Sequence, residues 1–124
     1  MGKHHSERFV TLVDDAKTRI EEITPEEVKE KMDEGDDFEL IDVREQDEWE
    51  SSHIADASYL GKGVIERDIE EEYPNTDEEL VLYCGGGFRS ALAADNLSKM
   101  GYNNVKSLAG GFRAWTEAGL PIEK

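Results

Sequence analysis

Cysteine, proline and long apolar runs are scarce in this sequence. Cys84 is the only cysteine in 124 residues, and there are three prolines. A single cysteine excludes a disulfide within the chain and is typical of a reducing compartment. No apolar run approaches the ~20 residues that span a bilayer as a helix, and the first residues lack the apolar core of a secretory signal. We therefore expect a cytoplasmic protein that does not associate with membranes.

Basic residues are also few, with 14 Lys and Arg against 30 Asp and Glu. The resulting formal net charge of −16 argues against nucleic acid or an anionic membrane as a partner. We interpret the acidic residues as a solubilising surface, and a halophilic source stays open as an alternative explanation.

Histidine is also scarce, which bears on whether the protein binds a metal. The three histidines, His4, His5 and His53, do not have metal-ligand spacing with Cys84, so no metal site is expected. We interpret His4 and His5 as part of a disordered end rather than as site residues.

What the sequence does contain is a glycine-rich run around its cysteine, Cys84-Gly85-Gly86-Gly87-Phe88-Arg89. The apolar residues before it, 79–83, fit a buried strand, and residues 90–97 fit a helix. Cys84 is therefore expected on a tight loop between the carboxyl end of a strand and the amino end of a helix. Ligands bind at this edge of parallel α/β sheets.

This loop has the composition of an anion-binding site built around a nucleophile. The glycines at 85–87 leave no side chain to block inward-pointing N–H groups, and the following helix adds its positive dipole end. Arg89 places a permanent cation at the far end of the loop. Such surroundings favour a Cys84 thiolate that attacks an anionic substrate, with Phe88 at the pocket rim. The alternative is a buried structural cysteine beside a glycine turn, which the glycines and the arginine disfavour.

Apolar periodicity and cap residues place the other elements. We expect helices over 9–20, 25–35, 45–51, 63–69, 89–100 and 112–118, and strands over 22–23, 38–43, 57–60, 80–83 and 105–108. Thr24-Pro25-Glu26-Glu27 is a capping box with proline at the first helical position, and Gly35 and Gly101 are the expected C-caps. Strands and helices alternate, which predicts an α/β fold with a parallel sheet and helices on both faces. We divide the chain into an N-terminal helical extension, 1–22, and one domain, 23–124.

Three motifs, in order along the chain, resemble the signatures of the rhodanese family. The first comprises Asp42-Val43-Arg44-Glu45, Glu48-Trp49 and residues 52–57, the second residues 83–90, and the third residues 108–115 with 118–121. The resemblance implies a rhodanese-like fold and an enzyme of the thiosulfate sulfurtransferase type. Such an enzyme moves sulfane sulfur from a donor such as thiosulfate to a thiophilic acceptor through a persulfide on Cys84. The resemblance implies no metal or organic cofactor.

The first of these motifs also contains candidate supporting residues. Arg44 is expected to pair with an acidic neighbour such as Asp42 or Glu48, because an unpaired buried charge is costly. The resemblance likewise implies a scaffold role for Arg44. His53 is expected to anchor a loop through a hydrogen bond rather than to donate a proton to a substrate.

Two other functions stay open. Phosphatases and arsenate reductases of the related fold have the spacing C-x5-R, whereas Cys84 and Arg89 form C-x4-R. The shorter loop makes a smaller cradle, which suits a sulfur atom better than a phosphoryl group. The other alternative is a persulfide carrier or binding module that serves a protein partner. The expected partners are therefore a small-molecule sulfur donor and acceptor, with a protein sulfur acceptor as the alternative.

Overall fold

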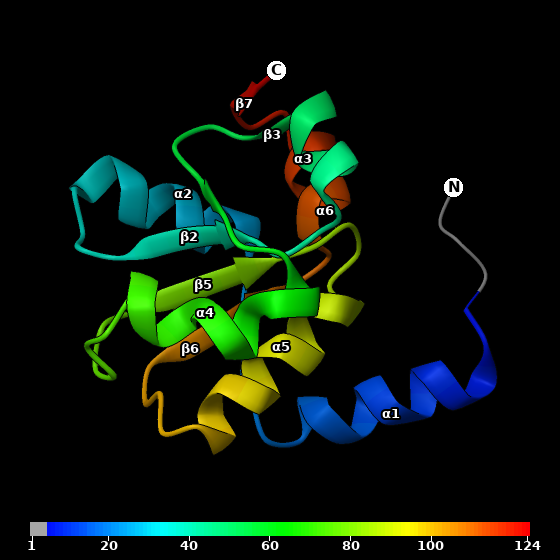
Figure 1. The fold of residues 1–124 in the computed structure, drawn as a ribbon. Coiled ribbons are helices and arrows are strands. Elements are labelled where there is room, and N and C mark those ends of the chain that lie inside the picture. Colours follow the sequence, from blue (N-terminus) through cyan, green and yellow to red (C-terminus); the bar gives the residue numbers. More distant parts are fainter. Residues whose placement is uncertain (1–4) are drawn as a thin grey trace.

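A five-stranded parallel sheet forms the centre of the computed structural model, which describes residues 5–124 (Figure 1). Its strands are β1 (Glu21–Ile23), β2 (Glu39–Asp42), β4 (Ser58–Tyr59), β5 (Leu80–Tyr83) and β6 (Val105–Leu108). They lie in the order β1-β6-β5-β2-β4, and every neighbouring pair is parallel. The α/β fold class predicted from the sequence is confirmed.

Helices cover both faces of this sheet (Figure 1). They are α1 (Glu7–Lys17), α2 (Pro25–Glu34), α3 (Gln46–Ser51), the 3-10 turn η1 (Lys62–Val64), α4 (Ile65–Glu72), α5 (Phe88–Lys99) and α6 (Gly111–Glu117). Side chains of β5 alternate between two cores, because successive residues of a strand point to opposite faces. Leu80 and Leu82 pack with residues of α4 and α5. Val81 and Tyr83 pack with residues of α2 and α6.

Local sequence signals explain most of the element boundaries. The Thr24 hydroxyl accepts a hydrogen bond from the Glu27 N–H at 3.1 Å, and the Glu27 carboxylate accepts one from the Thr24 N–H at 2.9 Å. This capping box starts α2 as predicted, and Gly35 ends the helix with a φ of +73°. The five expected strands are all present.

Helix α1 differs from its predicted bounds of 9–20. It begins at Glu7 and ends at Lys17. The start is set by Ser6, whose hydroxyl accepts a hydrogen bond from the N–H of Phe9 at 3.3 Å. Periodic apolar residues alone do not reveal such a cap, so the predicted helix began too late.

Three other features differ from expectation. The predicted helix over 63–69 is the turn η1 followed by α4. Gly101 is not the C-cap of α5: Met100 has that place, and Gly101 follows with a φ of +100°. A small antiparallel sheet joins β3 (His53–Ile54) to β7 (Ile122–Glu123). Neither strand was predicted, because their pairing joins segments far apart in the sequence that no local pattern relates.

Helix α1 packs along α5 (Figure 1). Val13 and Ala16 are its buried residues. Beyond the helix, Arg19 donates to both carboxylate oxygens of Asp95 on α5, at 3.0 and 2.9 Å. These contacts hold α1 on the face of the sheet that α5 covers.

No helix within residues 5–124 combines the length and the apolar character needed to cross a membrane.

A buried ion pair joins Arg44 to Asp42 at the end of β2. The two residues are 5% and 0% exposed. Arg44 Nε and Nη2 donate to Asp42 Oδ2 at 3.0 and 2.8 Å, and Nη2 also donates to the carbonyl of Ser52 at 2.6 Å. Burial opposes ionisation of the guanidinium, but the hydrogen bonds and charge of Asp42 outweigh it and raise the pKa of Arg44. The pair predicted for Arg44 is therefore present and ties the end of β2 to the segment before β3.

Replacing Asp42 with alanine should destabilise the fold, because it leaves the Arg44 guanidinium buried without its carboxylate. Breaking a buried pair in this way costs about 3–5 kcal/mol of unfolding free energy, which urea denaturation would measure. Asp68→Ala is the matched control, since Asp68 pairs with the exposed Arg67. Its unfolding midpoint should stay close to wild type. Equal shifts in the two variants would contradict a structural role for the buried pair.

Candidate active site

Cys84 lies directly after β5, on the loop that leads into α5, where the sequence places it. The residue is 1% exposed. The backbone N–H groups of Gly87 and Ser90 donate to its Sγ at 3.1 and 3.3 Å. The Ser90 hydroxyl lies 3.5 Å from Sγ and 2.8 Å from the hydroxyl of Ser107 on β6. Two backbone N–H groups thus donate to the sulfur, an arrangement suited to an anionic sulfur.

Two further N–H groups of the loop are free to meet a ligand. No acceptor within residues 5–124 takes up the N–H of Gly85 or of Gly86. Both glycines line the cavity beside Cys84. Gly87 then turns the chain into α5 with a φ of +93°, a conformation that favours glycine. The loop therefore has the geometry of an anion nest.

The start of α6 fixes the backbone of this loop. The N–H groups of Phe112 and Arg113 donate to the carbonyls of Cys84 and Gly85 at 2.7 and 3.0 Å. Gly111 makes the approach possible, because a Cβ at this position would lie 2.5 Å from the Cys84 carbonyl oxygen. Both loop carbonyls are thereby held at α6.

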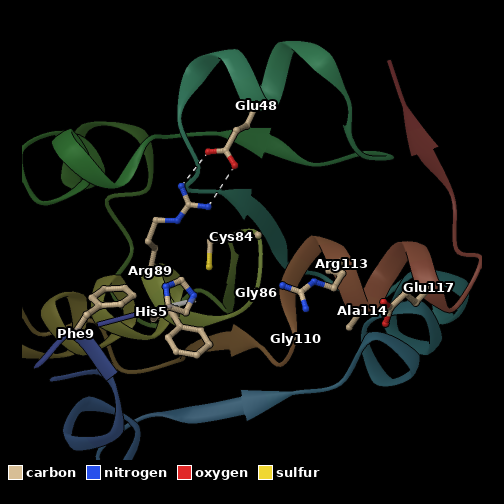
Figure 2. A pocket seen from close by; sticks show the side chains of 12 residues that line it. His5, Phe9, Glu48, Cys84, Gly86, Arg89, Gly110, Arg113, Ala114 and Glu117 are labelled. Carbon is tan, nitrogen blue, oxygen red and sulfur yellow. Dashed lines mark hydrogen bonds and ion pairs between the residues drawn. The ribbon is translucent and has the colours of Figure 1, made fainter. Parts of the chain in front are cut away.

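Arg89 lines the cavity and is paired with a carboxylate, which the sequence did not reveal. Its Nη1 and Nη2 donate to the two carboxylate oxygens of Glu48 at 2.9 and 3.3 Å (Figure 2). Desolvation opposes ionisation of Glu48, but the hydrogen bonds from Arg89 and from the Glu45 N–H outweigh it and lower the pKa of Glu48. The same hydrogen bond raises the pKa of Arg89. The two charges compensate each other in the wall of the cavity.

A cavity of about 720 Å³ opens beside Cys84. Its lining residues come from the N-terminal segment, from the loop after β5 and from the four helices α1, α3, α5 and α6: His5, Phe9, Glu48, Cys84, Gly85, Gly86, Phe88, Arg89, Gly110, Arg113, Ala114 and Glu117. Of the five loop residues expected at the site, Gly85, Gly86, Phe88 and Arg89 line the cavity, whereas Gly87 does not. Glu48 and Arg113 lie within the recognised motifs, but no local pattern shows where their side chains point.

The N-terminal segment contributes an aromatic wall, which the sequence did not reveal. The His5 ring lies 4.4 Å from the Phe88 ring and 5.2 Å from the Phe9 ring, measured between centroids. Phe9 and Phe88 stack at 5.9 Å. The prediction that His5 belongs to a disordered end is therefore wrong, whereas His4 lies outside the described residues. The apolar spacing of α1 predicts a helix but gives no sign that it reaches the loop.

The expected supporting residues Asp42, Arg44 and His53 do not line the cavity. His53 Nδ1 lies 3.0 Å from the carbonyl oxygen of Trp49, and the two rings stack with centroids 3.5 Å apart. These contacts are those of a loop anchor. Within residues 5–124 no group of three or more His, Cys, Asp and Glu side chains could hold a metal ion.

Comparison with known proteins decides the family. Residues 24–118 match the family model of the rhodanese-like domain. The chain belongs to the rhodanese-like family. It is 35% identical over 103 residues to a sulfurtransferase of Allochromatium vinosum, an alignment that covers 83% of this chain and 94% of that protein. It is 32% identical over 115 residues to YrkF of Bacillus subtilis, described as a candidate sulfur carrier protein. That alignment covers 93% of this chain but 57% of YrkF, so the chain spans little more than half of that relative.

A solved structure resembles the rhodanese-like chain over nearly its whole length. It is RPA3614 of Rhodopseudomonas palustris, a protein of unknown function described as a possible tyrosine phosphatase. The TM-score is 0.83 at 31% identity, and the alignment covers 99% of both chains. The alignment therefore includes α1, which lies before the residues that match the family model.

Gly111→Ala should distort the rhodanese-like loop, because its Cβ would collide with the Cys84 carbonyl. Gly119→Ala is the matched control: Gly119 also has a positive φ, +74° against +57° at Gly111, but nothing lies within 4 Å of its Cβ position. The left-handed conformation alone costs about 1–2 kcal/mol in either variant. Urea denaturation should show a clearly larger loss of unfolding free energy for Gly111→Ala than for Gly119→Ala. The rate of Cys84 alkylation should change only in Gly111→Ala. Equal losses of unfolding free energy and equal alkylation rates in the two variants would show that α6 does not hold the loop.

Proposed function

We propose that this rhodanese-like protein is a sulfurtransferase that carries sulfane sulfur as a persulfide on Cys84. The observation that supports this most strongly is the set of N–H groups around Sγ, two of them bonded to it and those of Gly85 and Gly86 beside it. A persulfide extends the side chain by one sulfur atom, whose negative charge these groups can stabilise. The names of the A. vinosum and B. subtilis relatives agree with sulfur transfer.

The reaction has two steps, neither of which uses a metal or organic cofactor. With thiosulfate as donor, the Cys84 thiolate attacks the outer sulfur, the S–S bond of thiosulfate breaks, and sulfite leaves with the bonding electron pair. The product is a negatively charged persulfide. A thiophilic acceptor such as cyanide then attacks the terminal sulfur, forms thiocyanate and returns the Cys84 thiolate.

A protein acceptor is a second form of the same activity, and the description of YrkF as a candidate sulfur carrier favours it. Cys84 is 1% exposed, so an acceptor must bring its thiol into the cavity to reach the sulfur. An acceptor thiol on a flexible segment fits this requirement better than one on a flat surface.

A phosphatase is the competing function, favoured by the description of RPA3614. A phosphatase needs a general acid that protonates the leaving group. Two acidic side chains line the cavity, Glu48 and Glu117, and the lowered pKa of Glu48 and its two bonds to Arg89 keep it ionised at neutral pH. The loop is also one residue shorter than C-x5-R requires. Both features favour sulfur over phosphoryl transfer.

Incubation with thiosulfate should add one sulfur atom to the wild-type protein, detected by intact mass and removed by cyanide. Cys84→Ser should fold normally and gain no sulfur, because a serine hydroxyl cannot form a persulfide. Hydrolysis of an aryl phosphate, measured in parallel, should be very slow in both proteins. Cys84-dependent phosphatase activity without sulfur uptake would overturn the proposal.

Glu48→Gln should raise kcat/KM for thiosulfate, because it removes the carboxylate that neutralises Arg89 beside a dianionic donor. The expected gain is about tenfold, equivalent to about 1.4 kcal/mol. Glu50→Gln is the matched control, since Glu50 lies on the same helix α3 but outside the cavity. An unchanged or lower kcat/KM in Glu48→Gln would mean that Glu48 orients Arg89 for the donor instead of competing with it.

A further inference from the structure

Arg113 is a cation of the cavity wall that has no carboxylate partner. Its side chain makes no hydrogen bond or ion pair with any residue in 5–124, whereas Arg89 is paired with Glu48. Its Nη2 lies 3.9 Å from the position that a Cβ on Gly86 would occupy. Figure 2 shows the guanidinium reaching from α6 toward the loop. Arg113 is therefore the cation of the cavity wall without an ion-pair partner in residues 5–124, and Glu117, one turn further along α6, is the other lining residue whose charge has none there.

The aromatic wall lines the same cavity, and its His5 and Phe9 lie on the other side of Cys84 from Arg113 (Figure 2). It consists of the His5, Phe9 and Phe88 rings, whose centroids lie 4.4 to 5.9 Å apart. These rings do not fill the space beside the sulfur, since all three line the cavity. A surface of this kind binds an apolar or aromatic group.

The cavity is large for an inorganic donor. Its volume of about 720 Å³ lies within the range of pockets that enclose organic molecules, roughly 300–1,000 Å³. Thiosulfate needs a cation close to the nucleophile, but Arg89 is already compensated by Glu48. An organic donor can instead place its sulfane sulfur at Cys84 and its charge at Arg113.

We infer that the natural donor is an organic sulfane compound that combines an apolar body with an anionic group. Its apolar body packs on Phe9 and Phe88, and its anionic group pairs with Arg113. This inference rests on the proposed function. For an organic persulfide the Cys84 thiolate attacks the outer sulfur of R–S–SH, the S–S bond of the donor breaks, and R–S⁻ leaves. Cys84 then carries the S–SH group, so atoms and charge balance.

The aromatic wall is tested with two thiosulfonates that share charge and reacting group but differ in body. Benzenethiosulfonate and methanethiosulfonate each give their outer sulfur to a thiolate and leave as a sulfinate. Phe9→Ala should lower kcat/KM for benzenethiosulfonate about tenfold and leave methanethiosulfonate nearly unchanged. Leu12→Ala is the matched control, because Leu12 lies on the same helix, is 55% exposed and does not line the cavity. It should change neither rate.

The role of Arg113 is tested with benzenethiosulfonate and its para-carboxy derivative. Arg113→Ala should remove a preference of about fivefold for the carboxylated donor, the size expected of an exposed ion pair. Arg67→Ala removes an exposed arginine on α4 outside the cavity and should keep the preference. Cyanide serves as acceptor throughout, and thiocyanate formation gives the rates.

The outcomes separate this inference from the function on which it rests. Sulfur transfer by wild type, with unchanged donor ratios in Phe9→Ala and Arg113→Ala, would overturn the organic donor alone. Failure of Cys84 to take sulfur from any donor would overturn the proposed function and this inference with it. A loss confined to benzenethiosulfonate in Phe9→Ala, with a loss of carboxylate preference in Arg113→Ala, supports the inference.

Discussion

The hydrogen bonds from the start of α6 to the carbonyls of Cys84 and Gly85 are the contacts on which the site depends. A short loop that leaves a strand can point either its carbonyls or its N–H groups at the sulfur. Because the N–H of a trans peptide points opposite to its carbonyl, the bonds from α6 to these two carbonyls direct the N–H groups of Gly85 and Gly86 away from α6. The N–H groups of Gly87 and Ser90 bond Sγ itself. Gly111 permits this contact, since any Cβ there would meet the Cys84 carbonyl. Cys84 and the third motif, residues 108–115, thus form one structural unit.

Charge is organised differently inside the site and over the rest of the protein. The chain as a whole has a formal net charge of −16, whereas two arginines and two glutamates line the cavity. Arg89 is held by Glu48, and Arg113 has no ion-pair partner among residues 5–124. An acidic protein of this kind repels small anions at long range and accepts them only at contact. Such a site favours donors that gain binding energy from apolar contacts as well as from charge.

Most of the fold follows from local patterns in the sequence, and the site follows only in part. Apolar runs identify the five strands, and the capping box at Thr24 starts α2. Three glycines after Cys84 predict the loop. The sequence does not reveal which side chains lie around that loop. Phe9 and Glu48 belong to elements that reach the loop through packing between distant parts of the chain. A sequence identifies Arg89 as a cation but cannot show that it is already paired.

The most direct measurement is a crystal structure of the protein after incubation with a sulfane donor. The account predicts electron density for one added sulfur on Cys84, within hydrogen-bond distance of the N–H groups of Gly85 and Gly86. The carbonyls of Cys84 and Gly85 should keep their bonds to α6. An added sulfur that points away from these N–H groups, or a Cys84 that remains unmodified, would contradict the claim that this loop is a cradle for a persulfide.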